Sequence, residues 1–226
     1  NLGDTIKYLS KKKKVLFIIT SNRWEMDKDI PKSSQIAYYL AEKIGKDKTK
    51  IIDASKLKIY QCEGNVSRAD GNNCGVKNAV LNDNFKNPSG YHRCWASINN
   101  KDDELWQISK LLLESDAVVF FGSVRWGQMN GIYQKLIERL TWLENRHSTL
   151  KENNLLKNIA AGLICTGQNW NGKNVVKTQK QVLSFFGFKT PKQLFWNWQY
   201  TNNSYDESQD SYKDAPRKFL KLLVLD

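Results

Sequence analysis

Apolar residues along this chain gather in short continuous runs, and most runs are followed by a longer stretch in which apolar residues recur at helical spacing. A short run rich in β-branched and aromatic residues, bounded by polar ones, predicts a buried strand. The sequence predicts strands at Val15–Thr20, Lys50–Ala54, Ala117–Gly122, Asn158–Thr166 and Gln193–Trp198.

The segments between these strands predict amphipathic helices. Their apolar stripes lie at Ile36–Ile44, Leu105–Leu112, Ile132–Leu140, Val175–Phe186 and Tyr212–Val224. We expect Ser33 or Ser34 to cap the first of these helices and Gly45 to end it. Asp102 and Asp103 suit the first turn of the second, where negative charge meets the helix dipole. Alternating strands and helices predict an α/β domain with a parallel sheet covered on both faces.

A long stretch at residues 55–100 has no clear periodicity and is rich in Asn, Gly and Lys. Compact domains seldom contain structureless loops longer than about 15 residues unless these loops serve binding or assembly. We therefore interpret the stretch as a functional or oligomerising insertion in one domain spanning residues 1–226. A linker between two domains is the alternative, but the segment that precedes it is too small to fold alone.

The net charge of +12 and pI near 9.4 raise the question of an anionic partner. The lysines are spread along the chain, with one clear run at Lys11–Lys14, and no nucleic-acid-binding motif accompanies them. We therefore predict no nucleic-acid partner, and the basic balance suits a phosphorylated cofactor. No apolar run approaches the roughly 20 residues of a membrane helix, so no membrane span is predicted.

The four cysteines do not predict a disulfide framework in a chain of this length. Cys62, Cys74 and Cys94 are too dispersed for the compact spacing of metal clusters, so no metal site is predicted. Together with the lack of a secretory signal pattern, this cysteine usage favours a cytoplasmic location.

Three polar loops follow the ends of predicted strands, at residues 21–34, 123–130 and 166–172. In open parallel sheets ligands bind beyond the carboxyl ends of the strands. The first loop offers serine hydroxyls, cationic side chains and a helix N-terminus, which together can bind a phosphate. The second and third place Trp126 and Trp170 beside Gly127 and Gly167, a combination suited to the edge and face of a flat ring.

Common catalytic and nucleotide-binding motifs are absent. The first strand lacks a following G-x-G-x-x-G, and Gln128 stands where a P-loop requires lysine after Gly122-x4-Gly127. No G-x-S-x-G elbow occurs, and neither His92 nor His147 has a clear nucleophile partner. We therefore nominate no catalytic side chain.

The loop sequences carry a family resemblance. Ser21-Asn22-Arg23 with Ser33-Ser34-Gln35, and more closely Ser123-Val124-Arg125-Trp126-Gly127-Gln128-Met129 with Lys135-Leu136-Ile137-Glu138-Arg139, resemble the flavodoxin-like superfamily. The similar branch is that of NAD(P)H-dependent FMN reductases and iron–sulfur-flavoprotein-like oxidoreductases. The third loop matches only in position, and Val124 and Arg125 replace a usual proline and aromatic residue.

This resemblance implies a doubly wound, five-stranded parallel sheet of order 2-1-3-4-5 with a long insertion after strand 2. It also implies an FMN-dependent oxidoreductase that passes electrons from NAD(P)H to a small acceptor such as a quinone or a flavin. The candidate cofactor-binding residues are Ser21, Arg23, Lys32, Ser33, Ser34, Gln35, Ser123, Val124, Arg125, Trp126, Gly127, Gln128, Met129, Thr166, Gly167, Gln168 and Trp170.

An alternative is an FMN-binding electron carrier or interaction protein without reductase activity, because a fold does not establish a function. The strongly basic charge favours the enzyme, since resemblance implies acidic surfaces for carrier flavodoxins. The family analogy further implies a homodimer or homotetramer, in which the insertion covers a neighbouring subunit's flavin. The sequence selects neither NADH nor NADPH and does not identify the acceptor.

Overall fold

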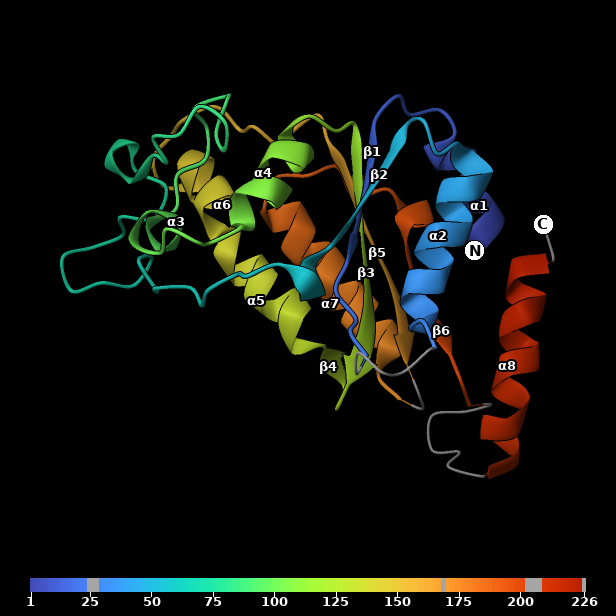
Figure 1. Ribbon diagram of the computed structural model, residues 1–226. Coiled ribbons are helices and arrows are strands. Elements are labelled where there is room, and N and C mark those ends of the chain that lie inside the picture. Colours follow the sequence, from blue (N-terminus) through green and yellow to red (C-terminus); the bar gives the residue numbers. More distant parts are fainter. Residues whose placement is uncertain (24–28, 168–169, 202–208, 225–226) are drawn as a thin grey trace.

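The computed structural model describes residues 1–23, 29–167, 170–201 and 209–224. Its centre is a parallel sheet of order β2-β1-β3-β5-β6 (Figure 1). These strands are β1 (Val15–Ile19), β2 (Thr49–Asp53), β3 (Ala117–Arg125), β5 (Ala160–Gly167) and β6 (Phe195–Gln199). The predicted order 2-1-3-4-5 is therefore confirmed. A two-residue strand, β4 (Gln128–Met129), pairs antiparallel with the end of β3 and was not predicted.

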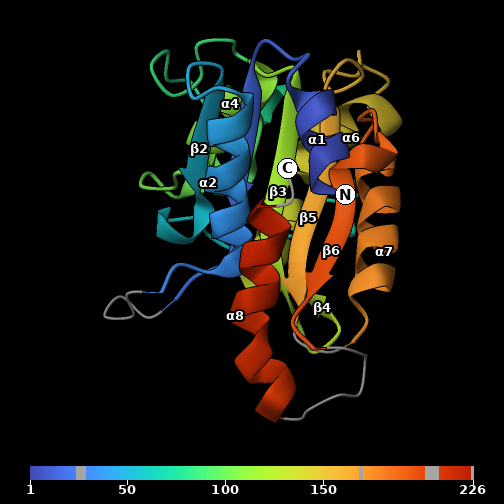
Figure 2. The same ribbon diagram turned by 90° about the vertical axis from the view of Figure 1, so that its right-hand side faces the viewer.

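Two helical layers cover the sheet. On one side lie α1 (Leu2–Leu9), α2 (Lys32–Ile44) and α8 (Gln209–Val224), in front of the sheet in Figure 2. On the other side lie α3 (Trp95–Asn99), α4 (Leu105–Leu113), α5 (Gly131–Arg139), α6 (Thr141–Ser148) and α7 (Gly172–Phe185). The doubly wound arrangement is the one that the alternating pattern predicts.

The central strands divide their side chains between two cores. Leu16 and Val118 face the layer of α4 to α7, whereas Phe17 and Val119 face α1, α2 and α8. Successive side chains of a strand point to opposite faces, and both faces are covered here. All four side chains are consequently buried, which explains why these strands are continuous apolar runs in the sequence.

Two expectations about helix starts are wrong. Helix α2 begins at Lys32 with Pro31 as its N-cap, so Ser33 and Ser34 lie within its first turn and cap nothing. Helix α4 begins at Leu105, so Asp102 and Asp103 precede its first turn. Ser33 bonds to Ser21 and Asp103 pairs with Arg139, and a local pattern does not reveal these partners.

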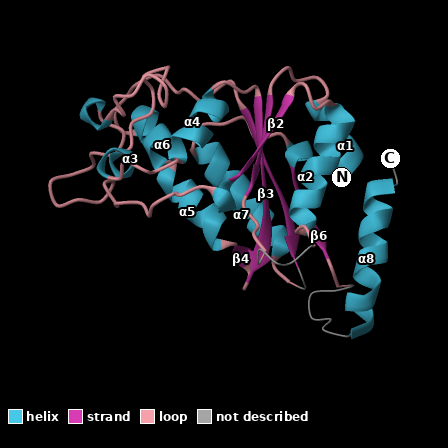
Figure 3. Ribbon diagram, in the orientation of Figure 1, coloured by secondary structure: helices cyan, strands magenta, loops and turns pink. Residues whose placement is uncertain are grey.

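The insertion at residues 55–100 is mostly loop, with two 3-10 turns and the short α3, and it packs beside α6 (Figure 3). Asn72 and Asn145 bond to each other, the indole Nε1 of Trp95 donates to the Asn73 carbonyl, and Arg93 pairs with Glu152 at 2.7 Å. These contacts within one chain fix the insertion without regular secondary structure.

The centre of this region is a buried ion pair between Asp103 and Arg139, both with fully buried side chains. The guanidinium donates to both carboxylate oxygens at 2.8 and 2.9 Å, to the Tyr60 carbonyl and to Ser97 Oγ. Burial alone would raise the pKa of Asp103, but the Arg139 bonds hold it below its usual range. Arg139, at the end of α5, thus joins the insertion to the domain.

None of the helices in the described residues is both long enough and apolar enough to cross a bilayer.

Candidate functional site

The first loop leaves the sheet at the end of β1 and returns at α2. Ser21 and Ser33 are buried with their hydroxyl oxygens 2.9 Å apart, and Ser34 is buried beside them. Among the described residues, no side chain caps the first turn of α2. A cavity of about 950 Å³ opens here; its lining includes Ser21, Asn22, Arg23, Ser34, Tyr38, Asp53 and Lys56. We call it the α2 cavity.

The structure does not bring every predicted residue of this loop to the α2 cavity. The Lys32 ammonium lies over the Phe219 ring of α8, 4.9 Å from its centroid. The Gln35 amide donates to the Ile30 carbonyl at 2.6 Å and braces the loop. Trp24, which the sequence placed in this loop, lies outside the described residues.

The second loop is a β-hairpin rather than an open loop. Strand β3 continues past Gly122 to Arg125, and Val124 and Arg125 pair with β4 across a two-residue turn. Trp126 and Gly127 form this turn with φ of 48° and 71°. Positive φ at both positions is what a tight hairpin turn requires. The predicted end of the strand at Gly122 is therefore wrong.

Residues of the third loop hold the tip of this hairpin. A Cβ on Gly127 would lie 2.7 Å from the Trp170 ring, and Asn171 Nδ2 donates to the Gly127 carbonyl at 2.7 Å. Trp126 is 94% exposed, so it does not fill a core. The hairpin therefore presents Trp126 from a backbone that is fixed on both sides.

The remaining predicted residues of the second and third loops are placed as follows. Met129 is buried in β4, while Gln128 beside it is exposed. Thr166 and Gly167 are buried at the end of β5, and Gly167 lies under Val124. Gln168 lies outside the described residues. The second and third loops thus meet, as expected for the ends of neighbouring parallel strands.

Asn130 joins the ends of β1 and β3, and sequence reasoning missed it. Its Nδ2 donates to the Thr20 carbonyl at 2.7 Å, and its Oδ1 accepts from Ser123 N–H and Thr20 Oγ1 at 3.2 Å each. A Cβ on Gly122 would lie 2.8 Å from Asn130 Oδ1. This glycine therefore allows the close packing at the point where the strand order reverses.

Tyr200, which follows β6, is a second residue that sequence reasoning missed. Its N–H donates to the Gly167 carbonyl at 2.9 Å, and its ring packs edge-on against Trp198. Burial raises the pKa of Tyr200, while Arg23 and Arg125 act to lower it. Arg23 and Arg125 come from different loops and act on the same hydroxyl, against Asp29, which raises its pKa.

A second cavity of about 620 Å³ lies between the hairpin and α5, and we call it the α5 cavity. Its lining includes Asn22, Gln61, Arg125, Gln134, Lys135 and Glu138. Asn22 also lines the α2 cavity, so the two hollows flank the same loop. Both lie at the carboxyl edge of the sheet.

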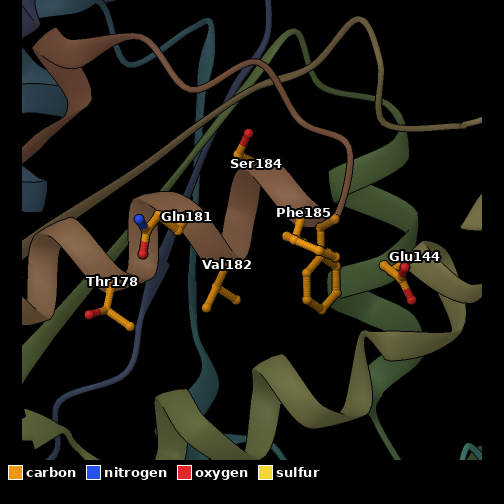
Figure 4. A pocket seen from close by; sticks show the side chains of 7 residues that line it. Glu144, Thr178, Gln181, Val182, Ser184 and Phe185 are labelled. Atoms are coloured by element: carbon orange, nitrogen blue, oxygen red, sulfur yellow. The ribbon is translucent and has the colours of Figure 1, made fainter.

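A third hollow, of about 730 Å³, is an apolar groove between α7 and α6 (Figure 4). The last turns of α7 form one wall with Val182 and Phe185, and Glu144 stands on α6. This groove lies at the end of α7 that points away from the carboxyl edge. None of the predicted site residues lines it.

Comparison with known proteins finds structures that resemble this chain, but no match at the level of sequence. No family model matches the chain, and no curated protein matches it in sequence. RosB, solved with a bound 8-demethyl-8-formylriboflavin-5'-phosphate intermediate, superposes with a TM-score of 0.57 at 16% identity over 94% of this chain and 76% of its own. Azoreductase from Bacillus anthracis str. Sterne superposes with a TM-score of 0.55 at 16% identity over 93% of this chain and 96% of its own.

A third structure, Smu.1420 from Streptococcus mutans UA159, has a TM-score of 0.53 at 13% identity and covers 94% of this chain and 100% of its own. At such low identity these matches establish the fold alone. The chain has the flavodoxin-like α/β fold, and the resemblance noted in its loop sequences is confirmed at that level.

Proposed function

We propose that this protein is a flavin-dependent oxidoreductase that binds FMN at the carboxyl edge of its sheet. In this proposal it passes electrons from NAD(P)H to a small acceptor. The observation that carries the proposal is the α2 cavity, where buried serine hydroxyls, a cation and the N-terminus of α2 meet. The RosB structure, which has the same fold and holds a riboflavin-5'-phosphate derivative, supports a flavin ligand here.

The residues at the α2 cavity fit a phosphate monoester. The N-cap of α2 has no side-chain hydrogen bond from the described residues, and Ser21 and Ser34 line the cavity beside it. A helix N-terminus favours anions through its free N–H groups and its dipole. Arg23 adds a positive charge at the rim. We propose that these groups hold the FMN phosphate.

The residues at the hairpin are suited to bind a planar ring. Trp126 is exposed on a fixed turn, and Trp170 stands on the neighbouring loop, 45% exposed. Exposed aromatic side chains at the rim of a cleft can stack on a ring and exclude water from it. We propose that the ring of the flavin lies beside the hairpin, with its phosphate toward α2.

The bound flavin would supply the two-electron chemistry, so no acid–base pair of the protein is required. The task of the chain is then to bind, orient and shield the cofactor. Arg125 provides a positive charge near the hairpin, which would stabilise an anionic ligand there. This assignment agrees with the absence of a recognisable catalytic motif in the sequence.

The test is the visible spectrum of the purified protein after addition of FMN and then of NADPH without oxygen. We expect flavin bands shifted by binding, and their bleaching by NADPH. Flavin that binds without bleaching by NADPH or NADH would favour an electron carrier. A protein that leaves added FMN in the flow-through of a desalting column would contradict the proposal.

We also propose a homodimer or homotetramer and a cytoplasmic location, as the family analogy implies. Light scattering after size exclusion measures the first. A monomer at micromolar concentration would contradict it.

A further inference from the structure

The α5 cavity has the chemistry of an anion-binding subsite. Its lining has two cations, Arg125 and Lys135, against one carboxylate, Glu138. The other polar side chains are amides, including Gln61 and Gln134, whose NH2 groups can donate to an oxyanion. Within the described parts of the chain, neither Arg125 nor Lys135 forms an ion pair shorter than 4.0 Å.

Rigid elements hold the two cations. Arg125 ends β3 and pairs with Gln128 across the hairpin, whose tip is fixed by Asn171. Lys135 lies in α5, one helical turn after Gly131. A strand and a helix hold the backbones of the two cationic residues in place. Binding an anion between them therefore requires no ordering of a loop.

The α5 cavity is distinct from the α2 cavity, yet it adjoins it. Asn22 separates the two, and the Arg125 side of the α5 cavity begins at the hairpin where we place the flavin ring. A molecule in the α5 cavity would therefore lie next to the ring and far from the phosphate-binding turn of α2. Such a position suits a second substrate rather than a part of the cofactor.

We propose that the α5 cavity binds the anionic group of the acceptor, so that this protein selects planar acceptors that bear a sulfonate or a carboxylate. The proposal rests on the flavin function above. Arg125 and Lys135 would hold the oxyanion, and the apolar ring of the acceptor would extend toward the hairpin. Removal of either cation should then weaken binding of a charged acceptor and leave that of an uncharged analogue unchanged.

The test compares anthraquinone sulfonate with uncharged hydroxymethyl anthraquinone, titrated into the FMN-loaded protein by calorimetry at low salt. We expect the sulfonate to bind about tenfold more tightly than the uncharged quinone. Lys135→Gln should weaken sulfonate binding roughly fivefold, so that the ratio of the two affinities falls to about two. Lys157→Gln is the matched control, because this exposed lysine precedes β5 at the opposite edge of the sheet. Higher salt should shrink the preference, since exposed charges are screened.

Equal affinity for the two quinones would overturn the proposal, as would equal losses in Lys135→Gln and Lys157→Gln. An increased KM for NADPH in Lys135→Gln, with sulfonate affinity unchanged, would assign the cavity to the reductant and also overturn it. Failure of the flavin function is a separate result, because the protein would then take up no FMN. The same titration on the flavin-free chain still tests whether Lys135 binds the anion.

Discussion

Arg139 and Arg125 lie 14 residues apart in the sequence and mark two opposite kinds of site. Arg139 is completely buried, and its guanidinium bonds to a carboxylate, a carbonyl and a hydroxyl of the same chain. Arg125 is exposed at the rim of a cavity, without an ion pair in the described residues. The charge of Arg139 is paired within the fold, whereas the charge of Arg125 is accessible to a ligand.

This difference separates structural from functional charge in a strongly basic protein. The Asp103–Arg139 pair is buried and bonds to Tyr60 and Ser97 of the insertion, whereas Arg23 and Arg125 at the carboxyl edge line cavities. A buried charge without a partner is very unfavourable, so buried charges in folded proteins are paired. An exposed unpaired charge has little effect on stability, and its position is free to serve binding.

The largest expected effect comes from breaking the buried pair. Arg139→Met leaves the Asp103 carboxylate buried without its partner and should lower the free energy of unfolding by about 3–5 kcal/mol. Arg217→Met is the matched control, because Arg217 pairs with Asp214 on the exposed face of α8. It should change stability by less than about 0.5 kcal/mol. Urea unfolding of both variants measures this, and equal effects would refute the comparison.

The second prediction concerns pH and the same buried region. Burial lowers the pKa of His92 to about 4; Asp103 acts to raise it and Arg139 to lower it further. Ser97 donates to Asp103, so His92 Nε2 donates to Ser97, and Nδ1 has no partner within the described residues. A second proton would therefore create an unsatisfied buried donor.

The unfolded chain binds a proton at His92 below about pH 6.5, whereas the folded protein does so only near pH 4. Stability from this group is complete above pH 6.5 and is lost as the pH falls toward 4, by about 3 kcal/mol. His92→Gln should flatten this part of the profile relative to the unsubstituted protein. Parallel stability profiles for the two proteins between pH 7 and 4 would contradict the assignment.

The sequence predicts the core of the fold well and its polar contacts poorly, for a physical reason. Strands such as Val15–Thr20 are buried on both faces, so their apolar runs are visible without knowledge of their neighbours. Helix α6 was missed because its buried face includes Asn145 and Arg146, whose partners Asn72 and Tyr91 lie in the insertion. A polar residue on a buried face hides the helical period.

The candidate site shows the same division. The serines and Arg23 of the first loop could be nominated from the sequence because a helix N-terminus, which favours anions, is a local feature. Asn130 and Tyr200 were not, since their roles depend on Thr20 and Gly167, which are distant in sequence. The hairpin was missed because Trp126 occupies a left-handed turn position that Asn or Gly usually fills.

The third prediction compares two glycines, one in the hairpin turn and one at the start of α5. Gly127→Ala places a methyl group against the Trp170 ring on a backbone with φ of 71°. A left-handed alanine costs about 1–2 kcal/mol, and the ring must shift as well. We expect a stability loss of about 1–2 kcal/mol together with weaker FMN binding. Gly131→Ala is the control, because its Cβ would meet open space in a helix and should be neutral or stabilising.

The smallest effect on stability, and the sharpest contrast with Arg139, is expected for Arg125→Gln. Its side chain is exposed, so the free energy of unfolding should change by less than about 0.5 kcal/mol. The same substitution should nevertheless weaken binding of anthraquinone sulfonate to the FMN-loaded protein, because it removes a cation from the wall between the hairpin and α5. Urea unfolding measures the stability, and calorimetric titration with that quinone measures the binding. Unchanged ligand affinities would show that this arginine is only a solvated surface charge, and a large loss of stability would show that exposure does not distinguish the two arginines.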